Sequence, residues 1–174
     1  IKRYLYGGYN YMKKTLIVLG ILAISLFSFT GCNDDSELNK YKREVEDFYE
    51  ELAERNDAIN AINSDTQAAS SELLDELDKV NVAFKEFAAL EVPKEYISVE
   101  SLADEAATLM DEAVTQYHQA FAGETINDFD ASLAYEKYCR AILRINYIGD
   151  IFQGKKLEGE NISIIYEEAP EDDE

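Results

Sequence analysis

Apolar side chains recur at steps of three and four residues through most of the chain between residues 38 and 152. This spacing places them along one face of an α-helix. Four such amphipathic stretches follow one another with short connections, which favours antiparallel neighbours. The pattern therefore predicts an all-α fold, an antiparallel four-helix bundle.

The boundaries of the first two helices rest on capping residues. The first helix is expected to start after residues 34–36, which offer three possible N-caps. Residues 63–65 predict a break, and Ser64 with Gln67 has the spacing of a capping box that opens a second helix. The alternative is one continuous helix over residues 36–90, because the three-four register persists across the gap.

Proline and glycine delimit the other two helices. Pro93 separates the second helix from a third, which Ser98 is expected to cap and Gly123 to end. A fourth is expected from about Asp130 to Phe152, with Gly154 just past its end. Alanines on the inward faces predict a close approach of these two helices. They stand at positions 106, 113, 134 and 141.

A different pattern occupies residues 12–32. Lys13 and Lys14 precede an apolar run, and a cysteine, Cys32, follows it. The run from Thr15 to Thr30 has 16 residues, short of the ~20 that a membrane-spanning helix needs, and no basic cluster follows it. Residues 12–31 are therefore predicted to be a cleaved export signal.

The end of this signal, Phe29-Thr30-Gly31-Cys32, resembles the lipobox of bacterial lipoproteins. The resemblance implies that Phe29, Thr30 and Gly31 are read by the signal peptidase and that Cys32 carries a covalent diacylglycerol. Phe29 stands where leucine is most common. Two acyl chains suffice for stable attachment where one is marginal. The mature protein is thus expected on the outer, extracytoplasmic face of the cell membrane, with no cofactor besides this lipid.

The predicted lipid-bearing residue also sets the boundaries of the other segments of the chain. Residues 1–11 are expected to be an untranslated leader, because Gly7-Gly8 can be encoded by a ribosome-binding sequence just ahead of Met12. A lipidated tether, the helical bundle and an acidic flexible tail are expected at residues 32–36, 37–154 and 155–174.

The charge of the mature chain limits its partners. Four of the 16 basic residues and none of the 36 acidic residues precede Cys32, which leaves 12 against 36 and a net charge of −24. Such a chain repels a nucleic-acid backbone, so nucleic acid is not an expected partner. Cys139 is the remaining thiol, and the usual burial of cysteine predicts a partly buried structural role.

The sequence predicts no catalytic or metal-binding residues. The only histidine, His118, lacks the glutamate three positions earlier that di-metal helix bundles use, so it is expected at the surface near a helix end. Recurring acids are interpreted as a solvated face, and tyrosines as core residues, although a tyrosine-lined groove would use the same positions. Arg55 interrupts an apolar stripe, and it is expected to extend to solvent or to form an ordered pair.

Four segments resemble small helical lipoproteins of clostridial-type Gram-positive bacteria: 92–96, 102–106, 110–114 and 138–141. The resemblance covers most of residues 38–154 and implies no activity. Function is therefore predicted as a membrane-anchored, non-enzymatic domain that binds an envelope protein or peptide. The alternative is a small-ligand protein with a sugar or peptide pocket between helices; a metal-dependent enzyme has less support.

Replacing the predicted lipid-bearing residue, Cys32→Ser, should release the domain from the membrane or leave an uncleaved precursor, because serine offers no thiol for the thioether. Intact mass spectrometry of protein extracted from host membranes checks this expectation. The wild-type mass should begin at Cys32 and include lipid. Unchanged membrane partitioning and mass in the variant would contradict the anchor.

Overall fold

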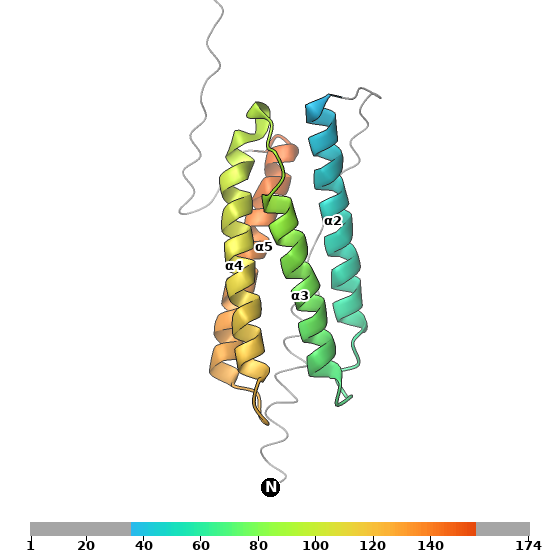
Figure 1. The fold of residues 1–174 in the computed structure, drawn as a ribbon, viewed down its shortest axis with the longest axis vertical. Helices are drawn as coiled ribbons and strands as arrows, with labels where there is room; N and C mark the ends of the chain where they lie inside the picture. The colour runs from blue at the N-terminus through green and yellow to red at the C-terminus, as the bar shows by residue number, and fades with distance from the viewer. Residues whose placement is uncertain (1–35, 156–174) are drawn as a thin grey trace, which may run out of the picture.

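The structure, a computed structural model, describes residues 36–155. Within this range four helices lie side by side and alternate in direction (Figure 1). They are α2 (Glu37–Ala61), α3 (Ala69–Ala88), α4 (Ile97–Phe121) and α5 (Asp128–Phe152), and a short 3-10 helix, η1 (Lys94–Tyr96), precedes α4. The predicted all-α four-helix bundle is confirmed. The leader, the export signal, Cys32 and residues 156–174 of the predicted tail lie outside the described residues.

The connection between α2 and α3 confirms the predicted break, so the alternative of one continuous helix is wrong. Asn63 organises this turn: its Oδ1 accepts a hydrogen bond from the Asp65 backbone N–H at 3.0 Å, and its carbonyl accepts one from Thr66 Oγ1 at 3.0 Å. The predicted capping box at Ser64 is wrong. Helix α3 begins only at Ala69, without a side-chain cap, because the turn around Asn63 extends past Ser64.

At the other helix ends, some of the capping residues predicted from the sequence are correct and others are not. Of the three predicted candidates, Ser36 caps α2, since its Oγ accepts a hydrogen bond from the Asn39 N–H. Ser98 does not cap α4, because η1 leads directly into a helix that already starts at Ile97. Asn127 caps α5 and starts it two residues ahead of the predicted Asp130. Gly154 follows α5 with φ of 66°, a left-handed conformation that costs glycine little.

Helices α4 and α5 make the closest approach in the bundle. The alanines predicted to allow it, at positions 106, 113, 134 and 141, are all 0% exposed. A methyl side chain leaves little between two helix backbones, so dispersion contacts form along the whole interface. The predicted close packing is confirmed.

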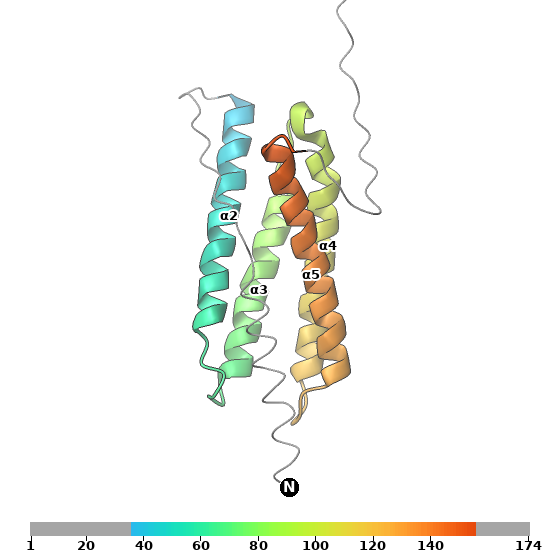
Figure 2. The same ribbon diagram turned by 180° about the vertical axis from the view of Figure 1, so that it is seen from behind.

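Helices α2 and α5 are held differently. No Cα atom of α2 lies within 8 Å of one in α5, although both line the side of the bundle seen in Figure 2. Aromatic side chains fill the distance. The rings of Tyr41 and Phe152 lie 6.1 Å apart, and the Tyr49 hydroxyl donates to the Ile145 carbonyl at 2.6 Å. On the neighbouring side, Phe48 stacks on Phe87 of α3 with ring centroids 4.1 Å apart.

The variant Tyr49→Phe should lower the free energy of unfolding by about 1 kcal/mol, because it deletes a buried hydrogen bond and keeps the ring. Urea denaturation followed by circular dichroism measures the loss. The matched control is Tyr147→Phe, at a half-buried tyrosine on α5, which should change stability by far less. Equal losses from the two variants would show that the hydroxyl does not help hold α2.

Candidate functional site

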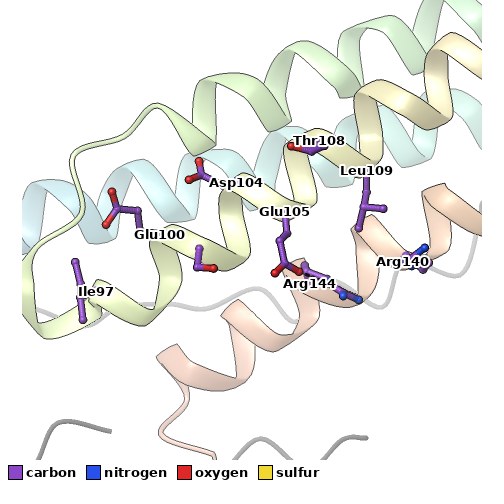
Figure 3. Close-up of a pocket in the computed structure, with 9 residues that line it drawn as sticks. Ile97, Glu100, Asp104, Glu105, Thr108, Leu109, Arg140 and Arg144 are labelled. Carbon is purple, nitrogen blue, oxygen red and sulfur yellow. Dashed lines mark hydrogen bonds and ion pairs between the residues drawn. The ribbon is translucent and has the colours of Figure 1, made fainter. Parts of the chain in front are cut away.

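A hollow of about 710 Å³ lies along the outward face of α4 beside α5 (Figure 3). Helix α4 supplies most of the lining, and α5 contributes two arginines one turn apart. The described lining residues are Ile97, Glu100, Ser101, Asp104, Glu105, Thr108, Leu109, Arg140 and Arg144. We call this surface the α4–α5 groove. It is an open surface feature rather than an enclosed cavity.

The two arginines of the groove differ in their freedom. Arg144 is tied to α4, since its Nε donates to Glu105 Oε2 at 3.1 Å and its side chain is only 20% exposed. Arg140 is exposed and makes no ion pair with any other described residue. A guanidinium has five donors arranged to hold a carboxylate or phosphate in a bidentate manner. Arg140 is therefore the cation in the groove that a ligand can engage without first breaking a protein contact.

The α4 side of the groove carries the opposite charge. Glu100 and Asp104 are exposed one turn apart, and both point away from α5 in Figure 3, whereas Glu105 points towards Arg144. Ile97 is 61% exposed at one end of the groove. The groove thus offers separate sites for an anion and a cation, with an apolar contact at one end.

Arg55 was expected either to extend to solvent or to form an ordered ion pair, and it forms the ion pair. Its Nη1 lies 3.3 Å from Glu76 Oε2 on α3, with 25% and 15% of the two side chains exposed. Lys79 contacts the same carboxylate. This part-buried pair joins α2 to α3 next to the turn that connects them, and it supports the register of the two helices.

Other predicted residues have mixed outcomes. His118 is at the surface as predicted, with Nε2 2.8 Å from Asp78 Oδ1 on α3. Cys139 is exposed, so the prediction of a partly buried thiol is wrong. It directly follows the buried Tyr138 on α5, and one helical step of about 100° turns it towards solvent. Among residues 36–155 no group of three potential metal ligands occurs.

The tyrosines lie mostly in the core, as the apolar spacing predicted. Tyr41, Tyr49, Tyr117 and Tyr138 are at most 6% exposed, and burial raises the pKa values of Tyr41, Tyr49 and Tyr138 above the ordinary range. A tyrosine-lined binding groove is therefore wrong for these four residues.

Asp111 on α4 belongs to the predicted acidic face, and two residues of α3 hold its side chain in place. Asp111 Oδ1 accepts hydrogen bonds from Lys85 Nζ and, at 2.8 Å, from Asn81 Nδ2, both on α3. These bonds, the one from Lys85 above all, lower the pKa of the Asp111 carboxyl below its ordinary value. The acidic face therefore also joins α3 to α4.

Sequence reasoning overlooked Arg140 and Arg144. Their signal was available: two arginines four positions apart in a strongly acidic chain. Comparison with protein-family models, curated proteins and solved structures found no match. The resemblance to small clostridial-type lipoproteins remains a prediction. Among the described helices, none combines the length and hydropathy needed to cross a membrane.

Asp111→Asn should make stability less dependent on acid pH. A lowered carboxyl pKa in the folded state contributes stability above the unfolded pKa of ~3.9, and this contribution disappears as pH falls through the lower folded pKa. Because the side chain is 49% exposed, we expect a loss within about 1 kcal/mol at pH 7 that shrinks near pH 3. Urea unfolding at both pH values checks this. A difference independent of pH would contradict it.

Proposed function

We propose that this protein is a lipid-anchored, extracytoplasmic binding protein that holds an extended peptide segment of an envelope protein in the α4–α5 groove. The anchor rests on the Phe29–Cys32 lipobox resemblance. The binding role rests chiefly on one observation: Arg140 is exposed in the groove without an ion pair to another described residue. The proposed role is non-enzymatic, and it requires only that the groove present groups complementary to those of the peptide.

The charges of the groove favour a peptide that carries both acidic and basic side chains. A carboxylate of the peptide pairs with Arg140, and a lysine or arginine pairs with Glu100 or Asp104 on the other side. Ile97 and Leu109 supply apolar contacts. An extended peptide suits this surface because its side chains alternate in direction. Neighbouring residues of the peptide can therefore contact Arg140 on α5 and the acidic residues on α4.

A second candidate, a small-ligand site for a sugar, is supported by a hollow of about 500 Å³ between α2 and the α3–α4 connection. Leu90 and Val92 contribute apolar surface there, and Glu44 and Lys94 contribute polar groups. Hydrogen bonds from sugar hydroxyls to such charged groups, beside an apolar surface, are suited to sugars.

Arg140→Ala should weaken peptide binding about tenfold or more, because a charge-assisted hydrogen bond contributes roughly 1.5–3 kcal/mol. The probe is a fluorescent library of extended peptides that vary in charge pattern, read by fluorescence anisotropy. Peptides with both an acidic and a basic residue should bind best.

The matched control is Arg43→Ala, which removes an exposed arginine of α2 outside the groove. It should bind like the wild type. Equal weakening by both variants would indicate general charge attraction, and an unchanged Arg140→Ala affinity would refute the groove as the binding site. Binding of peptides regardless of their charge pattern would also contradict the proposal.

A further inference from the structure

Helix α5 carries a second stripe of mostly apolar residues, on the face turned away from the bundle core. Its members alternate at steps of four and three residues, which is the spacing that forms the seam between two paired helices. They are Phe129, Leu133, Glu136, Arg140, Leu143 and Tyr147. The core residues of α5, such as Ala131, Tyr138 and Ile145, lie on the opposite side of the helix. We call the outward stripe the α5 seam.

The apolar members of the α5 seam are accessible to a partner. Phe129 is 71% exposed and Leu143 is 40% exposed, while Leu133 and Tyr147 are half-buried. The outer face of a helix in a soluble bundle is ordinarily polar. Apolar residues that are scattered singly need no explanation, but a connected stripe of them indicates a surface on which another element packs.

The two remaining members of the α5 seam carry opposite charges. Glu136 and Arg140 are exposed one turn apart, and neither forms an ion pair with the other or with a further residue among 36–155. Charges within an otherwise apolar seam specify the direction and register of a second helix, because like charges repel across the contact.

The α5 seam is complementary to an antiparallel copy of itself. In an antiparallel pairing centred on position 138, residues equally far before and after that position face each other. Three pairs then meet across the contact: Phe129 with Tyr147, Leu133 with Leu143, and Glu136 with Arg140. A parallel pairing would set each of the two charges against its own copy, which is repulsive. Apolar contacts and charge therefore agree for the antiparallel arrangement.

We propose that two copies of this chain associate through the α5 seam, antiparallel, around a two-fold axis beside position 138. Such an interface is self-complementary, so both copies contribute the same residues. Helix α5 has a net charge of −1, whereas α2, α3 and α4 carry −4, −3 and −5, so it is the described helix on which two acidic copies repel least. The paired stretch is about 27 Å long, which makes a small interface and a weak dimer.

The acidity of the whole chain is compatible with this pairing. Residues 156–174, with eight acids and one lysine, follow the paired stretch, and the two chains continue from opposite ends of an antiparallel contact. At physiological salt, charges more than about 8 Å apart are largely screened. The two-fold axis is perpendicular to the plane of the paired helices and leaves α2 of both copies on the same side of that plane. Both proposed lipid anchors can therefore reach one bilayer.

Cysteine cross-linking determines which positions of two copies are close together. Ser132 and Asn146 are exposed beside the α5 seam, on either side of position 138. In the full chain with Cys139→Ser, either Ser132→Cys or Asn146→Cys is introduced, and the two variants are co-expressed with different tags. A short bismaleimide is then added to membranes of the host, or to the soluble fraction if the anchor fails. Cys139→Ser alone is the control for the thiol of Cys32.

Antiparallel pairing predicts cross-links between the two variants, because positions 132 and 146 of different copies lie about 3 Å apart along the helix direction. Two copies of either position lie roughly 18 Å or more apart in that direction, so cross-links within one variant should be several-fold fewer. Cross-links chiefly within each variant would indicate a parallel contact. Either that result or the absence of cross-linking would overturn the proposal.

Exchange of the two central charges tests the register. Glu136→Arg alone places arginines opposite each other across the contact and should lower cross-linking several-fold. Glu136→Arg combined with Arg140→Glu restores opposite charges between the copies and should restore cross-linking. A double variant that stays as weak as the single variant would refute the register.

The apolar contact is tested separately. Leu143→Glu should lower cross-linking several-fold, because a symmetric pairing loses two leucines at once. The matched control is Val82→Glu, which places the same charge at a 53% exposed apolar residue of α3 outside the seam. Circular dichroism confirms that both variants are folded. Equal losses from the two would show that added negative charge, and not the seam, determines the yield.

Arg140 belongs both to the α5 seam and to the α4–α5 groove, so a second copy and a bound peptide compete for it. This competition rests on the proposed peptide site. Leu143→Glu, outside the described lining of the groove, should leave peptide affinity at least as high as in the wild type. A lower affinity would contradict the competition. If no peptide binds, the cross-linking pattern still decides whether the copies pair, and peptide binding without the predicted cross-links would overturn the pairing alone.

Discussion

The arrangement of this bundle depends on the contact between α4 and α5. Alanines at the interface let the two backbones approach closely, and dispersion contacts accumulate along the full length of both helices. Helix α2 stands further from α5, and large rings occupy the space between them. The bundle is therefore packed by small residues between α4 and α5 and by aromatic residues between α2 and α5.

Polar contacts reinforce this packing where they cross between helices. The Tyr49 hydroxyl reaches the backbone of α5, and Arg55 with Glu76 joins α2 to α3. Asp111 joins α4 to α3 through two donors. Such contacts specify which helix lies beside which, because an incorrect register would leave buried or half-buried groups without partners. The acidic surface therefore contributes to the fold as well as to solubility.

The arrangement of the helices connects the fold to the proposed role. Because the helices alternate in direction, the start of α2 and the end of α5 lie at one end of the bundle. The α4–α5 groove lies along the outward face of α4 beside α5. In the proposed role, this groove is the surface that a peptide of the cell envelope would contact.

The sequence by itself determined the helices, the break near Asn63, the end at Gly154 and the close α4–α5 contact. These features depend on periodicity, on backbone preferences of single residues and on side-chain size, all of which are local. Only the tertiary structure decided that Glu76 pairs with Arg55, that Arg140 is exposed beside the acidic side of the α4–α5 groove, and that Cys139 faces solvent. Each of these depends on the relative rotation and neighbours of packed helices. A helical period states which residues share a face, but the residues that meet across an interface are determined only when the faces pack.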